Sequence, residues 1–126
     1  MKLRLRENSI RLRLLQAEVK QLRETGNVSE RIIFGVNPTE TLIYSLRVSE
    51  DAETIYAQMT DNQIEIFLPL KTAENWADTS EVGLYATQTI GDLDELKINI
   101  EKDFVCVERP NDVDNKDAFP HPKTNC

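Results

Sequence analysis

The chain is poor in the residues on which many small functional sites depend. Its 126 residues include only two cysteines, one histidine and four glycines. Two cysteines and one histidine leave little material for a disulfide scaffold, a zinc finger or a histidine-based catalytic site. No GxSxG, HExxH, CxxC or glycine-rich phosphate-loop motif is present in the sequence. These absences exclude the enzyme and metalloprotein classes that such motifs define.

Long apolar runs are also missing. No run approaches the roughly 18–20 residues needed to cross a bilayer, and Met1–Arg6 alternates charged and apolar residues where a secretory signal needs an unbroken apolar stretch. We therefore expect a soluble, cytoplasmic protein without a membrane partner. The formal net charge of -7 also argues against a nucleic-acid partner, because such proteins usually need a positive surface to displace counterions.

The sequence is nevertheless rich in strand patterns. Lys2–Arg6 and Ile10–Leu14 alternate polar and apolar residues around Glu7–Ser9, which predicts a β-hairpin. From Leu15 the apolar spacing becomes helical, and Gly26 can end that helix in a left-handed cap. Similar patterns predict six further strands, within residues 31–34, 41–48, 53–59, 63–68, 82–90 and 96–100.

These elements predict one α+β domain over residues 1–107, followed by an acidic irregular C-terminal tail over residues 108–126. A second short helix is expected from Thr72 to about Ala77, with Trp76 facing the core. Short connections favour antiparallel neighbours, so we expect an antiparallel β meander that forms a barrel or a two-layer sheet with two short helices. We detect no internal repeat in the sequence.

Several segments spread over nearly the whole chain form a recognisable set: Met1–Leu14, Phe34-Gly35, Tyr44–Leu46, Phe67–Pro69, Trp76 and Glu101–Cys106. With these segments the chain resembles a small bacterial family of uncharacterised proteins. The resemblance implies a stand-alone bacterial cytosolic protein, and it transfers no functional residue because that family has no assigned activity.

One candidate site is cationic. Guanidinium groups pair well with phosphates and carboxylates, so arginines that pointed into a barrel would make an anion site. We expect instead that the leucines between them fill the core and that the arginines face solvent, beside Glu65 and Glu101. The candidate anion-binding residues are Arg4, Arg6, Arg11 and Arg13, with Lys2, Arg47 and Lys97 as further cations.

A second candidate site combines Cys106, His121 and Cys126. Two thiolates and an imidazole are ligand types that zinc or copper prefers. Their spacing matches no standard zinc module, and a cytoplasmic location keeps thiols reduced. We therefore expect this tail to bind metal weakly or not at all.

No pattern points to a particular reaction. We expect a small, soluble, non-catalytic binding or accessory protein whose ligand the sequence does not identify. The alternatives are a phosphate- or anion-binding barrel enzyme that uses the N-terminal arginines, and a transition-metal or redox protein that uses the two cysteines and the histidine. A homodimer through a sheet edge would need neither site.

Overall fold

The computed structural model describes residues 1–104 and residue 119. Within these residues the chain forms eight strands, two α-helices and a 3-10 turn, which confirms the predicted α+β class with two short helices. The elements are β1 (Lys2–Arg6), β2 (Ser9–Leu14), α1 (Gln16–Thr25), β3 (Asn27–Ile33), η1 (Pro38–Glu40), β4 (Thr41–Ser49), β5 (Tyr56–Thr60), β6 (Gln63–Pro69), α2 (Leu70–Asp78), β7 (Gly83–Ile90) and β8 (Asp94–Lys102).

The strands form two four-stranded sheets. One has the order β1-β2-β8-β7 and the other the order β3-β4-β6-β5. The outer pairs of each sheet are antiparallel, but the central pairs, β2 with β8 and β4 with β6, are parallel. The expectation of an antiparallel meander is therefore wrong for the central pairs, because each pairs strands that are distant in the chain. The described strands close into no barrel, and the two-layer alternative is confirmed.

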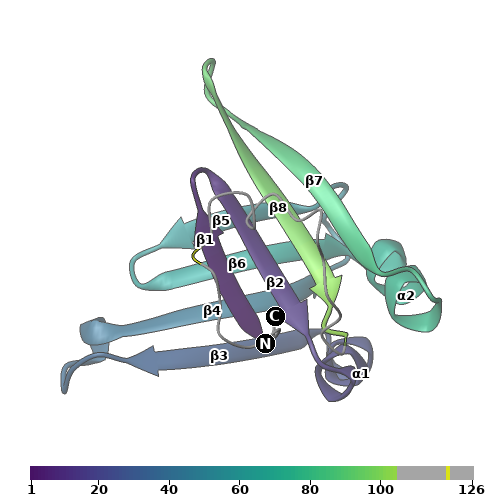
Figure 1. The fold of residues 1–126 in the computed structure, drawn as a ribbon, viewed down its shortest axis with the longest axis horizontal. Coiled ribbons are helices and arrows are strands. Elements are labelled where there is room, and N and C mark those ends of the chain that lie inside the picture. Colours follow the sequence, from purple (N-terminus) through teal and green to yellow (C-terminus); the bar gives the residue numbers. More distant parts are fainter. Residues whose placement is uncertain (105–118, 120–126) are drawn as a thin grey trace.

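The hydrophobic core lies between the two sheets. Both helices lie together at one side of the molecule (Figure 1), and they contribute Leu22 and Trp76, which are fully buried. Apolar side chains at alternate positions of the strands complete the core: Ile10, Leu12, Leu14, Val28, Tyr44, Leu46, Ala57, Ile66, Leu68, Leu84, Ile98 and Ile100.

The fold contains an internal duplication that the sequence does not reveal. The first half has the element order β1-β2-α1-β3-β4, and the second half repeats it as β5-β6-α2-β7-β8. Each sheet combines one hairpin from each half: β1-β2 joins β8-β7, and β5-β6 joins β4-β3. The two halves are therefore related by a pseudo-two-fold arrangement that exchanges the sheets.

Corresponding residues of the two halves make the same hydrogen bonds. Asn8 follows the first residue of the β1-β2 turn, and its side chain donates to the backbone oxygen of Glu95 at 2.6 Å. Asn62 has the same place in the β5-β6 turn and donates to the backbone oxygen of Thr41 at 2.5 Å. In each half, the asparagine ties its own hairpin to the strand that lies parallel beside it.

The helix ends also repeat. The hydroxyl of Thr25 donates to the oxygen of Gln21 at 2.8 Å, and the hydroxyl of Thr79 donates to the oxygen of Asn75 at 2.7 Å. Each hydroxyl also accepts a bond from the backbone N–H two residues later. The core positions of the two halves share only apolar character, and many outer positions differ in type, as Arg13 and Phe67 do, which explains why the repeat escapes detection in the sequence.

Candidate binding surface

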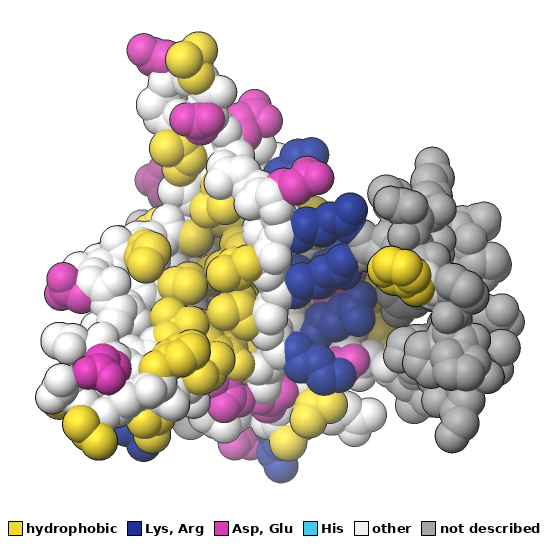
Figure 2. Space-filling view, turned by 60° about the vertical axis from the view of Figure 1, so that its left-hand side comes forward, with side chains coloured by type: hydrophobic (Ala, Val, Ile, Leu, Met, Phe, Trp, Pro, Cys, Tyr) yellow, Lys and Arg dark blue, Asp and Glu magenta, His cyan; other side chains and the backbone are white. Residues whose placement is uncertain are grey.

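The outer face of the sheet β1-β2-β8-β7 is strongly cationic. The strand register places Lys2 beside Arg13 and Arg4 beside Arg11. Side chains on a strand alternate between faces, so these cations point away from the core-facing leucines. A row of basic side chains is visible on this face (Figure 2).

The predicted division of β1 and β2 into a core face and a basic face is confirmed apart from one leucine, although Arg11 and Arg13 are half-buried rather than exposed. Leu12 and Leu14 are almost fully buried, whereas Arg4 and Arg6 are exposed. Leu5 is the exception, since its side chain is 61% exposed. The other expected core residues on these strands, Leu3 and Ile10, are half-buried and buried respectively.

Glu101 lies in the middle of the cationic face. Its Oε1 atom is 3.1 Å from Arg11 Nε and 3.6 Å from Arg13 Nε, and its Oε2 atom accepts a hydrogen bond from the hydroxyl of Tyr85 at 2.9 Å. Among the described residues, Oε1 is buried and accepts no hydrogen bond. The two guanidinium groups therefore stabilise this carboxylate through charge rather than through well-aligned hydrogen bonds.

The predicted cations are not all brought together. Arg47 lies on the other sheet, where its Nε is 3.3 Å from Glu65 Oε2. Lys97 lies on the same sheet as the N-terminal arginines, opposite Ser9 in the register. The expected pairing is confirmed for Arg11 and Arg13 with Glu101 and for Arg47 with Glu65. The cationic row lies on an outer face rather than inside a closed cavity.

The metal-site hypothesis falls on residues that the structure does not describe. Cys106, His121 and Cys126 all lie outside the described residues. Within residues 1–104 and 119, no group of three or more histidine, cysteine, aspartate or glutamate side chains is arranged to hold a metal ion.

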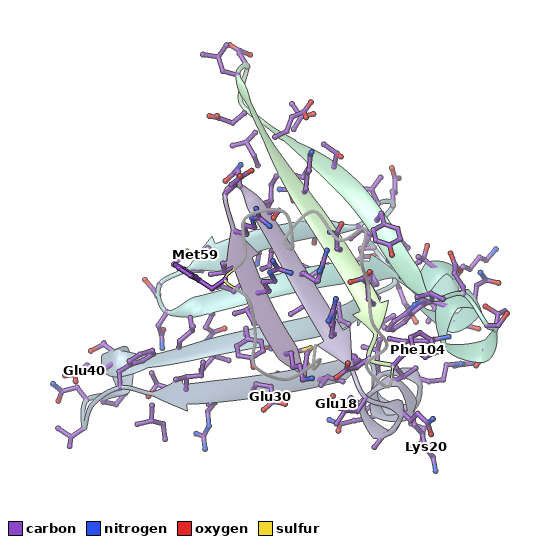
Figure 3. The ribbon with its side chains drawn as sticks, viewed as in Figure 1. Glu18, Lys20, Glu30, Glu40, Met59 and Phe104 are labelled. Atoms are coloured by element: carbon purple, nitrogen blue, oxygen red, sulfur yellow. The ribbon has the colours of Figure 1, made fainter. Side chains whose placement is uncertain are left out.

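A cluster of charges anchors the start of β1. The α-ammonium of Met1 contacts the carboxylates of Glu18 and Glu30, and the hydroxyl of Tyr44 donates to the oxygen of Met1 at 2.8 Å. Figure 3 places Glu18 and Glu30 next to the N-terminus. Burial alone would raise the pKa of Glu18, but the hydrogen bonds from the ammonium and from Leu15 outweigh it and lower that pKa.

A cavity of about 450 Å³ lies beside the two helices. Its lining residues include Leu14, Val19 and Ala77, together with Lys20 and Phe104, which are labelled in Figure 3. Arg23 also lines it, but Asp78 holds its guanidinium at 3.2 Å.

The side of the molecule away from the helices is open and apolar. No described element covers the inner faces of the sheets there, and Figure 2 shows a hollow of hydrophobic side chains next to the cationic row. The exposed fractions are 61% for Leu5, 42% for Ile32 and 71% for Met59. We call this surface the open apolar side; the inward-facing residues that form it are Leu3, Leu5, Ile32, Leu42, Met59 and Ile64.

The edge strand β1 borders the open apolar side. It is the terminal strand of its sheet, and Arg6 and Ser9 are paired across its two-residue turn. Hydrogen-bonded pairs alternate with non-bonded pairs along an antiparallel ladder, so the backbone N–H and C=O groups of Leu3 and Leu5 point away from β2. No described strand lies on that side of β1.

The corresponding edge of the other sheet is sealed. Ala57 on β5 corresponds to Leu3 on β1, and its N–H donates to Gln88 Oε1 at 2.7 Å. The side-chain amide of Gln88 also donates to the oxygen of Ala57 at 3.1 Å. In the first half, the position of Gln88 is occupied by Ile32, whose side chain has no hydrogen-bonding group. Among the described residues, the duplication has therefore left one edge paired with a side chain and the other edge without such a partner.

Reasoning from the sequence identified the basic face but missed the open apolar side. Leu5 has the same alternation as buried strand residues, so it is assigned to the core. Only the way the two sheets meet leaves Leu5 and Met59 exposed. The similar turns Glu7-Asn8 and Asp61-Asn62, whose first residues adopt φ of 51° and 52°, reflect the duplication but do not indicate which side is exposed.

Comparisons with known proteins place the chain without assigning it an activity. Within the described residues, no helix is long and apolar enough to cross a membrane. No curated protein and no solved structure matches the chain. The model of a family of unknown function, DUF7009, matches residues 1–123. The chain therefore belongs to the DUF7009 family.

Proposed function

We propose that this protein is a non-catalytic binding protein and that the open apolar side is its binding surface. The observation that carries the proposal is the exposure of Leu5, Ile32 and Met59 next to a row of basic side chains. Contiguous apolar surface with a polar rim is typical of interaction sites. A cytoplasmic location and a partner other than nucleic acid are parts of the same proposal.

The charge of this one face favours an acidic partner, although the whole chain is acidic. The cations of β1 and β2 outnumber the carboxylates paired with them, since Arg11 and Arg13 share Glu101 and Lys2 lies 2.9 Å from Asp103. Opposite charges across an interface guide association and fix its orientation. An apolar surface beside this face therefore suits a ligand that has both apolar and negatively charged groups.

Selection from a displayed library of random short peptides tests the proposal. The full chain should enrich peptides whose binding is lost in the double variant Leu5→Asp, Met59→Asp. Leu93→Asp is the matched control, because Leu93 is 95% exposed at the far β7-β8 turn. Enriched peptides that bind the double variant and the wild type equally, or a selection that enriches none, would refute the proposal.

A second candidate function is binding of a phosphate-rich anion on the cationic face, through Arg4, Arg6, Arg11 and Arg13. The pairing of Arg4 with Arg11 and of Lys2 with Arg13 favours it, because adjacent cations can contact one polyanion together. Inorganic triphosphate should then raise the melting temperature, and Arg11→Gln should reduce that rise. Arg31→Gln on the other sheet is the control, and equal effects of both variants would exclude the site.

A further inference from the structure

We infer that β1 accepts an extended segment of a partner protein as a fifth strand of its sheet, and that this segment alternates apolar and acidic residues. The inference rests on the proposed function, since it specifies the partner of the open apolar side. Strand addition to an exposed sheet edge is a known mode of peptide recognition, in which backbone hydrogen bonds supply affinity and alternate side chains supply specificity.

The backbone of β1 is suited to this role. Leu3 and Leu5 turn their N–H and C=O groups toward the side where no described strand lies. The sealed edge of β5 shows that such outward groups form hydrogen bonds where a partner is present, since Ala57 makes two with Gln88. Ile32 cannot replace Gln88 in the first half, so an added strand is the natural partner for this edge.

The side chains of β1 determine the sequence of the added strand. Leu3 and Leu5 face the open apolar side, and Lys2, Arg4 and Arg6 face outward. Neighbouring strands place side chains of the same face about 5 Å apart. Inward residues of the added strand would thus be apolar and would cover Leu5 and Ile32, while its outward residues would be acidic beside the basic row.

A second copy of β1 fits this edge poorly. Pairing two β1 strands would place the lysine and arginines of one chain beside those of the other, and like charges in neighbouring cross-strand positions are destabilising. The same argument favours glutamate- or aspartate-containing segments, whose charges complement the basic row. The inference therefore commits to an acidic partner segment rather than to a homodimer through β1.

Synthetic peptides can test each part of the inference on the full chain. A fluorescent peptide in which valine and glutamate alternate should bind, with an affinity that falls as salt increases. A peptide of the same composition with all glutamates in one half, and a valine-lysine alternating peptide, should bind at least about tenfold more weakly. Two further peptides carry N-methyl groups on alternate backbone amides, one on the even and one on the odd positions. Only one of them should lose binding, because only alternate amides of the added strand face β1.

A proline substitution tests the edge itself. The N–H of Leu5 makes no bond to β2 in the alternating ladder, so Leu5→Pro should leave the hairpin paired. The variant should have a melting temperature close to that of the wild type. Its affinity for the alternating peptide should be about tenfold lower, as expected for the loss of one hydrogen-bond donor at the edge. If Leu5→Pro fails to fold, the N-methylated peptides test the same bonds without changing the protein.

Hydrogen exchange separates the possible occupants. The amides of Leu3 and Leu5 should exchange rapidly in the free protein and become protected when the alternating peptide binds. Protection in the free protein at all concentrations would assign the edge to the chain's own residues beyond Phe104, and protection that grows with protein concentration would assign it to a second copy. Either result would overturn the inference.

The two proposals fail in different ways. Selected peptides that need Leu5 and Met59 but tolerate N-methylation in both registers would support the open apolar side and refute strand addition. Loss of every binder that depends on Leu5 and Met59 would refute the proposed function itself. Binding of the alternating peptide with protection of the Leu3 and Leu5 amides would support both.

Discussion

Arg11 contacts Glu101 across β2 and β8, and the same pair recurs on the other sheet with the charges exchanged. Arg11 Nε lies 3.1 Å from Glu101 Oε1, and at the corresponding positions Arg47 Nε lies 3.3 Å from Glu65 Oε2. Each pair adds one positive and one negative charge to its sheet. The greater basicity of the β1-β2 face therefore comes from Arg4, Arg6 and Arg13, whose counterparts on the other sheet are Gln58, Thr60 and Phe67.

We expect Glu101→Gln to lower the free energy of unfolding by about 1–3 kcal/mol, because Arg11 and Arg13 would lose the carboxylate between them. Glu65→Gln should cost less, about 0–1 kcal/mol, because its partner Arg47 is 46% exposed. Urea denaturation of both variants measures the difference. An equal or larger cost for Glu65→Gln would show that the Glu101 cluster has no special stabilising role.

Trp76→Ala should lower the free energy of unfolding by about 3–5 kcal/mol, through lost contacts and a residual cavity. The side chain is completely buried, and its Nε1 donates to the oxygen of Val82 at 3.3 Å. Val36→Ala is the control, because Val36 is 99% exposed. A denaturant midpoint that Trp76→Ala leaves unchanged would contradict the position of α2 against the core.

Stability should depend on pH through the cluster at Met1. The lowered pKa of Glu18 implies a contribution that is present above 4.5, its ordinary value, and lost as pH falls through the lower folded pKa. Burial opposes the charge of the Met1 ammonium, but hydrogen bonds from it to Glu18 and Glu30 raise its pKa above 8.0. Its contribution is therefore present below that pH and lost as pH rises through the raised folded pKa.

Urea midpoints measured across pH test this cluster. Glu18→Gln should reduce the fall of the urea midpoint at acid pH and should lower the midpoint at neutral pH. Glu24→Gln on the same helix should change neither. Glu24 is a suitable control because its side chain is 62% exposed and lies 4.0 Å from Lys20. If the urea midpoint of Glu18→Gln falls at acid pH as much as that of the wild type, the pH dependence belongs to other carboxylates.

Gln88→Ala should destabilise the protein by about 1–3 kcal/mol, because the N–H and C=O groups of Ala57 would lose their partner at a half-buried edge. Gln58→Ala, on the exposed outer face of the same strand, should stay within about 0.5 kcal/mol of the wild type. Thermal and urea unfolding give the comparison. Equal stability of the two variants would mean that water replaces the seal at β5.

Protein purified without an affinity tag should contain less than one equivalent of zinc or copper. Cys106, His121 and Cys126 lack the spacing of a standard zinc module. Elemental analysis alongside a Cys126→Ser variant provides the measurement. One equivalent of metal that disappears in the variant would establish the metal site and make it the leading functional hypothesis.

The sequence by itself determined the local elements. Alternating residues predicted β1 and β2 as a hairpin, and Gly26, with φ of 75°, ends α1 in the predicted left-handed cap. The same alternation correctly assigned leucines to the core face and arginines to the outer face. These features depend on neighbours a few residues apart, which is why periodicity and capping patterns reveal them.

The tertiary structure alone decided how these elements combine. The parallel pairs β2-β8 and β4-β6 join strands from different halves of the chain, and no local pattern encodes such a choice. Leu5 and Leu12 have the same alternation, yet Leu5 is 61% exposed and Leu12 is 1% exposed. Their difference arises because burial depends on which surfaces meet in space, and the open edge at β1 exists only once the two sheets have packed.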